Sequence, residues 1–239
     1  MMSTRLWIQL SAPFGAFRTF TAGWYRPTAR FLTHSAAYGI LLNLAGIESR
    51  LWEHEDGHRG KVPASLTRPG LPRARIALGI PEGHDPPSVH TIFQQLHNYP
   101  VGAQSGISQE WARGRKNNIT PVRRELLRDI SAVIVIEGDH YFLSAIEQGI
   151  RGAGQVERYG LPFVGDNNFL PDRLEVTDPI SARWYHRVEI KGKIGGDTTR
   201  LTIRVDRTGM TETVSDLFSP TEYPSHEIHS NAWAEVGDV

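Results

Sequence analysis

The chain has 239 residues and no cysteine, which excludes a disulfide framework, a cysteine nucleophile and a cysteine-ligated zinc site. Its 26 lysine and arginine residues are balanced by 26 aspartate and glutamate residues, so net charge draws it neither to nucleic acid nor to a membrane. The start of the chain lacks the apolar core of a secretory signal, and no apolar run reaches the length of a membrane span. We therefore expect a cytoplasmic protein without membrane contact, in which any nucleic-acid site arises from local clustering of basic residues.

Hydrophobic periodicity predicts alternating strands and helices along the first 176 residues. Leu6, Ile8 and Leu10 alternate with other residue types, as in a strand. Apolar residues from Ile40 onward recur at helical spacing after Ser35, a suitable N-cap. The expected elements, in chain order, are a strand over 6–10, a helix over 34–52, a strand over 73–80, two hairpin arms over 90–101 and 119–129, a strand over 131–138, a helix over 141–150 and a strand over 169–176.

This order of elements, with the hairpin inserted, is that of a ferredoxin-like α+β fold, which RNA-recognition (RRM-like) modules also adopt. We expect one such domain over residues 1–176, from which the hairpin projects as a thumb over about 90–129. Residues 177–239 are expected to pack on the same domain as a C-terminal extension. This extension contains a β-ribbon over 183–207, followed from about residue 215 by a polar tail without a clear period.

The motifs of metal-dependent and nucleophilic catalysis predict no site. His54 and His58 have the spacing of the HExxH motif, but Asp56 and Gly57 between them and Pro63 nearby predict a loop. Zinc binding by this motif requires a helix that turns both imidazoles to one face. The carboxylates form no paired signature, and the sequence has no GxSxG, Walker A or dinucleotide-binding motif. We therefore expect no bound metal and no cofactor.

Basic and aromatic residues are interleaved in the loop that follows the first strand. Arg18 and Arg26 supply forked donors for phosphate groups, and Tyr25 supplies a face on which an unpaired base can stack. The phenylalanines of this loop are expected to pack beneath it. A loop that only covers the core is the alternative, and the sequence leaves it open.

The hairpin region is the most basic stretch of this neutral chain. Between residues 111 and 128 it carries six basic side chains, opposed only by Glu125: Arg113, Arg115, Lys116, Arg123, Arg124 and Arg128. A projecting basic hairpin is suited to grip a nucleic-acid strand. Charge on an edge strand also protects against edge-to-edge aggregation, so both interpretations stand.

A turn-rich segment, RYGLPFVGDNNFLPDRL, covers residues 158–174. Glycine in this loop would let the backbone approach a phosphate closely, and the asparagines could bond base edges or sugar hydroxyls. The candidate RNA contacts here are Arg158, Tyr159, Gly165, Asn167 and Asn168. The alternative is a surface turn stabilised by its own aspartate and asparagine side chains.

Three of these segments together resemble the CRISPR-associated Cas-five family of the RAMP superfamily, most nearly its MYXAN or DevS-like branch. They are SAPFGAFRTFTAGWYRPTARFLTHSAAYGILLNLAGIE (residues 11–48), QQLHNYPVG with ITPVRRELLRD (the hairpin arms), and RYGLPFVGDNNFLPDRLEV (residues 158–176). The resemblance covers most of residues 5–176, and the rest of the chain adds little to it.

The resemblance implies a subunit of a Type I CRISPR Cascade complex that holds the 5′ handle of the CRISPR RNA. Such a subunit contacts the large subunit and the backbone subunit and serves antiviral defence or another RNA-guided DNA-targeting role. Contact with target DNA near the PAM, the short duplex motif that effector proteins read, is a further implied role. By position, Arg18, Tyr25 and Arg26 resemble handle contacts, and residues 102–118 resemble the tip of the thumb.

Binding without catalysis is the expected role, because the branch that the chain resembles leaves CRISPR RNA processing to a separate enzyme. A metal-independent endoribonuclease is the alternative. Its acid–base candidates are Tyr25, His34, Tyr38, His97 and Tyr99, which form no convincing triad. His34 is expected near a helix N-terminus, where a charged imidazole is disfavoured. A DNA-binding regulator ranks last, because both predicted helices are expected to be buried.

Overall fold

The computed structural model describes residues 4–19, 24–50, 67–97, 119–153, 158, 160–188, 196–205 and 212–237. Its elements, in chain order, are β1 (Thr4–Gly15), β2 (Tyr25–Arg26), α1 (His34–Leu44), β3 (Ala74–Pro81), β4 (Ser88–His97), β5 (Ile119–Gly138), α3 (His140–Arg151), β6 (Arg173–Val176), β7 (Ala182–Arg187), β8 (Thr199–Arg204), β9 (Val214–Pro220), the 3-10 helix η3 (Ser230–Ala232) and β10 (Ala234–Val236). Within the described residues, no helix is both long and apolar enough to pass through a membrane.

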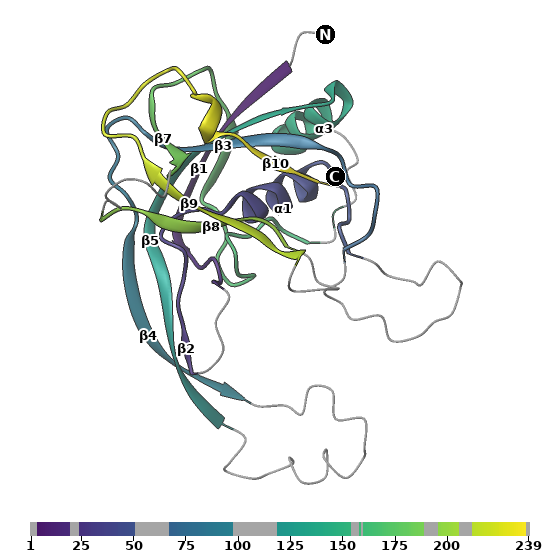
Figure 1. Cartoon of the computed structure of the whole chain (residues 1–239). Coiled ribbons are helices and arrows are strands. Elements are labelled where there is room, and N and C mark those ends of the chain that lie inside the picture. The colour runs from purple at the N-terminus through teal and green to yellow at the C-terminus, as the bar shows by residue number, and fades with distance from the viewer. Residues whose placement is uncertain are drawn as a thin grey trace, which may run out of the picture.

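The fold is α+β, a large and mostly antiparallel sheet with two α-helices among the described residues. At the centre of the sheet the strand order is β6-β1-β5-β3, and every neighbouring pair is antiparallel. α1 lies between β1 and β3 in the chain, and α3 lies between β5 and β6 (Figure 1). Both helices share one hydrophobic core with the sheet, which continues from β3 through β7 and β9 to β8.

β5 is a 20-residue strand with partners along both edges. One edge pairs with β1 and then with β2, and the other pairs with β3 and then with β4. The hairpin arm predicted over 119–129 and the strand predicted over 131–138 are therefore one element, which corrects the sequence analysis. Asp129 has a φ of 59°, which aspartate tolerates, and it has no register partner in β1. The pairing with β1 continues on either side of it, at Arg128 and at Ile130. Figure 1 shows the β4–β5 hairpin extending well beyond the body of the molecule.

α1 differs at both ends from its prediction. Its N-cap is Thr33, whose hydroxyl accepts a hydrogen bond from the Ala36 amide at 3.2 Å, and not Ser35. The helix ends at Leu44, well short of its predicted end. Gly46 stops it there, because its φ of 71° places the backbone in the left-handed region that ends many helices.

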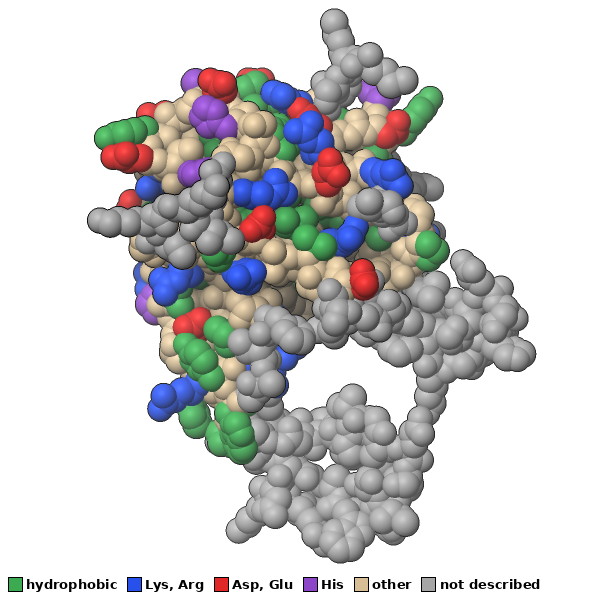
Figure 2. Space-filling view, in the orientation of Figure 1, with side chains coloured by type: hydrophobic (Ala, Val, Ile, Leu, Met, Phe, Trp, Pro, Cys, Tyr) green, Lys and Arg blue, Asp and Glu red, His purple; other side chains and the backbone are tan. Residues whose placement is uncertain are grey.

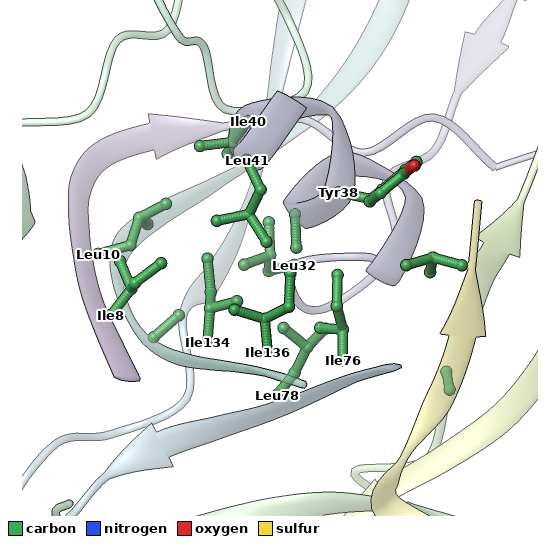
Figure 3. Packing of buried hydrophobic residues seen from close by; sticks show 14 of the residues in the cluster. Ile8, Leu10, Leu32, Tyr38, Ile40, Leu41, Ile76, Leu78, Ile134 and Ile136 are labelled. Carbon is green, nitrogen blue, oxygen red and sulfur yellow. The ribbon is translucent and has the colours of Figure 1, made fainter. Parts of the chain in front are cut away.

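α1 is apolar around most of its circumference because it is covered from two sides. Figure 3 shows Ile40 and Leu41 packed over the sheet residues Ile8 and Ile134. Residues of β7, β8 and β9 close the same core on the opposite side of the helix: Tyr185, Leu201 and Phe218. A helix buried on both sides does not need the polar stripe of a surface helix.

The C-terminal segment corrects two expectations. The ribbon predicted over 183–207 is wrong in its pairing, because among the described residues β7 and β8 do not pair with each other and β9 lies between them. The tail beyond about residue 215, which shows no clear period, forms most of β9 and all of η3 and β10. Its apolar residues lack a period because they pack in different places, Phe218 against α1 and Trp233 on the other face of the sheet.

The sheet face opposite the helices is also covered. Trp7, Val133 and Val135 pack there with Trp184 and Trp233, and all five side chains are buried. Trp7 and Trp184 meet edge to face, with 5.6 Å between their ring centroids. RNA-recognition modules stack bases on this face of their sheet, so the equivalent surface of this chain is closed to a base.

The crossing of the two helices depends on Gly149 of α3. A Cβ at this position would overlap the carbonyl group of Leu44 at the end of α1. We expect Gly149→Ala to destabilise the fold by about 1–3 kcal/mol, because either helix must shift to admit a methyl group. Gly39→Ala is the control, since Gly39 is exposed on α1 with no atom in reach of a Cβ. It should stabilise by about 0.5–1 kcal/mol in urea unfolding. Equal stability of the two variants would contradict this view of the crossing.

His34, the first residue of α1, gives the fold a dependence on pH. The side chain is fully buried, and neither ring nitrogen has a hydrogen-bond partner within the described residues. Burial, assisted by the nearby charge of Arg187, lowers the pKa of His34 to about 3. Below about pH 6.5, His34 is therefore protonated in the unfolded chain and neutral in the folded chain. The free energy of unfolding consequently falls as the pH falls.

Replacing His34 by leucine should remove this dependence. Between about pH 6.5 and 4, the wild type should lose roughly 1.4 kcal/mol per pH unit relative to His34→Leu. At pH 8 the variant should be as stable as the wild type or more so, because an unpartnered polar group leaves the core. Urea unfolding across this pH range measures both effects, and parallel stability curves for the two proteins would refute the assignment.

Candidate nucleic-acid interface

The segment after β1 is fixed against the base of the β4–β5 hairpin. β2 runs parallel to β5, with Tyr25 opposite Arg123 and Arg26 opposite Arg124. The Arg123 amide donates to the carbonyl of Trp24 at 2.9 Å. This pairing places residues predicted from two distant parts of the sequence at one location.

Three arginines meet on one face of this strand pair. Arg26 and Arg124 are register partners, so their side chains point to the same side, and the charge of Arg18 acts on Arg26 as well. Partial burial, followed by repulsion from Arg18 and Arg124, lowers the pKa of Arg26 below its ordinary value. Of the three, Arg18 is exposed and Arg26 is half-buried. We call Arg18, Arg26 and Arg124 the arginine cluster.

The other face of the hairpin base is aromatic. Tyr25, Arg123 and Phe93 are register partners across three adjacent strands, so they share that face. The ring of Tyr25 is 48% exposed and that of Phe93 is 68% exposed, which leaves both surfaces open to a stacking partner. The Tyr25 hydroxyl donates to Glu125, and this hydrogen bond is the main cause that raises the tyrosine pKa. Glu125 also accepts from the Thr28 amide at 3.0 Å, so it anchors the segment after β2.

The turn-rich loop lies against the arginine cluster through Asp166. Its carboxylate forms an ion pair with Arg124, and it accepts from the Asn168 amide at 2.9 Å and the Asn168 side chain at 2.8 Å. Burial alone would raise the pKa of Asp166, but these hydrogen bonds outweigh it and hold the pKa below its ordinary value. Asp166 is thus ionised at neutral pH and partly neutralises the cluster. The guanidinium of Arg124 also lies 5.6 Å from the ring centroid of Phe169.

Glycine at 165 has a structural explanation. Its φ of 77° is in the left-handed region, and a Cβ would overlap the carbonyl group of Ala16 at the end of β1. The neighbouring Val164 carbonyl accepts from the Ala16 amide at 3.1 Å, which joins loop and strand. Asn168 bonds to Asp166 within the turn, and Asn167 is exposed. Among Gly165, Asn167 and Asn168, Asn167 is therefore the residue whose side chain is not needed to form the turn.

The other predicted contacts lie elsewhere. Arg158 donates to the carbonyl of Gly149 in α3, and Gly160 accepts from the Asn43 side chain of α1 at 3.0 Å. This end of the loop thus belongs to the helix ends, away from the arginine cluster. The remaining candidates lie outside the described residues: Arg113, Arg115, Lys116 and Tyr159.

The sequence did not indicate Phe93 as a candidate, because its position on the same face as Tyr25 depends on strand register. The residue lies in β4, directly opposite Arg123, and the register of a strand pair cannot be inferred from the sequence of one strand. Exposed Arg30, whose charge acts on Tyr25, was also absent from the predicted set. Its position just after Tyr25 and Arg26 in a basic, aromatic loop was the available signal.

The acid–base candidates do not converge in the described residues. His34 is buried, and the buried Tyr38 donates its hydroxyl to the Pro72 carbonyl at 2.6 Å. The HExxH-like motif at 54–58 and Tyr99 lie outside the described residues. Within the described ranges, no group of three or more histidine, aspartate or glutamate side chains is placed to hold a metal ion.

Taken together, the hairpin base offers the arginine cluster on one face and, on the other, exposed aromatic rings beside Arg123. Guanidinium groups bind phosphates, and exposed rings stack on unpaired bases. Figure 2 shows lysine and arginine side chains on the visible surface of the hairpin base next to hydrophobic ones. This combination suits a single-stranded nucleic acid better than a small metabolite.

Comparison with known proteins finds similarity of fold alone. No family model matches the sequence, and no curated protein matches it. Among solved structures, the chain is similar to one from a "CRISPR RNA-guided surveillance complex", with a TM-score of 0.53 and 12% sequence identity over 93% of this chain and 92% of the other. It is also similar to a structure described as "Crystal structure of Cas protein", with a TM-score of 0.41 and 12% identity over 92% and 94%. The first of these likenesses shows that the two chains share a fold.

Arg124 should act as the anchor of the turn-rich loop. We expect Arg124→Met to remove the ion pair with Asp166 and to raise amide exchange at Val164, which donates to the Phe169 carbonyl at 2.7 Å. Loss of one charged hydrogen bond, about 1.4 kcal/mol, corresponds to roughly tenfold faster local opening. Arg123→Met is the matched control, because the Arg123 side chain is exposed on the other face. Similar exchange at Val164 in both variants would disprove the anchoring role.

Proposed function

We propose that the protein is a non-catalytic RNA-binding subunit of a CRISPR Cascade complex, in which it holds the 5′ handle of the CRISPR RNA. The observation that carries the proposal is the arginine cluster at the base of the β4–β5 hairpin, where the charges of Arg18 and Arg124 act on Arg26 and one carboxylate, that of Asp166, pairs with Arg124. Like charges gathered in this way repel one another in the free protein. The phosphates of an RNA strand would relieve that repulsion.

The architecture supports this proposal. The chain shares its fold, over almost its whole length, with a chain from a CRISPR RNA-guided surveillance complex. The β6-β1-β5-β3 order and its connections fit a ferredoxin-like domain, and the β4–β5 hairpin fits a projecting thumb. Because the sheet face opposite the helices is closed by tryptophans, we place the RNA path at the hairpin base instead of across the sheet.

Two kinds of contact follow from the two faces of the hairpin base. The arginine cluster would bind consecutive phosphates of the handle. Tyr25 and Phe93 would stack on bases that turn away from these phosphates. Contacts with the large subunit and the backbone subunit, and a role in antiviral defence in the cytoplasm, belong to the same proposal. They follow from membership of such a complex.

Catalysis is not part of the proposal, because the hairpin base favours binding. The Tyr25 hydroxyl is engaged with Glu125, and its raised pKa makes it a poor general base near neutral pH. His34 and Tyr38 face the core, where an RNA strand does not reach. A metal-free incubation with repeat RNA on a denaturing gel should leave the RNA intact, and a discrete cut would establish an endoribonuclease instead.

The binding role is tested with Arg18→Ala and Arg26→Ala combined. We expect the double variant to bind repeat RNA about tenfold or more weakly. The slope of log affinity against log salt should fall by about 1.4, at roughly 0.7 for each phosphate contact to a single strand. Filter binding at several salt concentrations measures both quantities.

The matched control combines Arg151→Ala and Arg200→Ala. It removes the same charge from exposed positions outside the hairpin base. Its salt slope should equal that of the wild type, and both double variants should retain the wild-type melting temperature. A slope that falls equally in the two double variants would mean that net charge alone matters, and the proposed site would be abandoned.

A further inference from the structure

A second basic site lies in a cavity of about 380 Å³ between the β3–β10 pair and the ends of β8 and β9. None of its lining residues belongs to β2, β4 or β5, the strands that form the hairpin base. Its lining residues are Arg75, Arg187, Ile203, Arg204, Val214, Ser230, Trp233 and Glu235. It thus combines three guanidinium groups with one carboxylate and an apolar wall.

Two of the arginines are held in place by the fold. Arg187 donates to the Trp233 carbonyl at 2.7 Å, pairs with Asp216 at 3.3 Å and lies over the ring of Phe218. Arg75 pairs at 3.3 Å with Glu137, whose side chain is almost fully buried. Side chains fixed in this way are preorganised, so a ligand need not immobilise them.

Because Arg75 and Arg187 are already paired with Glu137 and Asp216, the lining charges without an ion pair among the described residues are Glu235 and the third arginine, Arg204. Within the described residues its side chain has no hydrogen bond and no ion pair, although it is partly buried. A β-bulge between Thr202 and Arg204 interrupts the alternation of β8 next to the cavity. A guanidinium group that has lost part of its hydration and has no partner favours an anionic ligand.

The apolar part of the lining argues for a protein ligand over a nucleic acid. Val214 is 41% exposed and offers hydrocarbon surface, which a phosphodiester chain cannot fill, whereas Ile203 belongs to the buried core. The indole of Trp233 is already covered by the guanidinium groups of Arg75 and Arg5, at 5.2 and 5.4 Å from its centroid, so it offers no free face to a base. Arginine is instead enriched among the residues that contribute most of the binding energy in protein interfaces.

We propose that this cavity binds a partner protein through an acidic side chain with apolar neighbours, and that Arg204 pairs with its carboxylate. Arg187 and Arg75 orient the ligand from their fixed positions, and the exposed Val214 receives the adjacent apolar group. The proposal does not rest on RNA binding at the hairpin base, so its test contains no RNA in the first arm. Failure of one proposal therefore leaves the other standing.

The test uses the whole chain and a fluorescein-labelled peptide of alternating glutamate and leucine, followed by anisotropy up to millimolar protein. We expect binding that Arg204→Glu weakens by about tenfold, which corresponds to the loss of one ion pair. Arg200→Glu is the control, because Arg200 is exposed on the same strand and bonds to Ser215 outside the cavity lining. It should change affinity less than about twofold.

Two further arms keep the proposal open to refutation. A peptide with glutamine in place of glutamate should not bind, and Arg204→Ala, a milder change, should weaken the glutamate peptide in the same direction as Arg204→Glu. Equal binding of both peptides, no binding at millimolar concentration, or equal effects of the Arg204 and Arg200 variants would overturn the proposal. An RNA oligonucleotide whose binding depends on Arg204, with no peptide binding, would assign the cavity to nucleic acid and overturn it as well.

Discussion

The ladder of hydrogen bonds along β5 is the constraint on which the rest of the molecule depends. Half of this 20-residue strand lies in the core between β1 and β3, and the other half forms the hairpin with β4 and holds β2. No loop separates the two halves, because the pairing with β1 continues on either side of Asp129. The direction of the hairpin is therefore set by core packing. Residues at its base inherit the rigidity of the buried strand, which favours a preorganised binding surface over one that folds around its ligand.

Electrostatics at the hairpin base are local, as a chain with no net charge requires. Asp166 is the element that makes the arginine cluster tolerable in the free protein, because its ionised carboxylate offsets one of three positive charges. The same carboxylate fixes the turn that brings Gly165 onto the end of β1. The turn-rich loop thus contributes to the site mainly by positioning Arg124. Its glycine is explained by close packing with Ala16 without invoking a phosphate.

How far the sequence predicts this structure depends on whether the determining contacts are local. Alternation at Leu6, Ile8 and Leu10 and the spacing around Ile40 reflect local periodicity, and both elements are present. Strands were predicted where β7 and β8 lie, but β9 and β10 were not predictable in this way, because Phe218 and Trp233 are buried by segments far away in the chain. The site shows the same limit. Tyr25 and Arg26 are adjacent in sequence and were grouped together, yet they point to opposite faces once β2 pairs with β5.

The closed sheet face changes what the fold can be used for. A sheet has one face free for a ligand when helices cover only the other, but here Trp184 and Trp233 occupy that face. The two proposed sites are instead the hairpin base and the arginine-lined cavity. The same C-terminal segment supplies Trp233 to both the covering layer and the cavity wall. The covering of the sheet face and the shape of the cavity therefore both depend on the position of Trp233. A variant that displaces this side chain should disturb both.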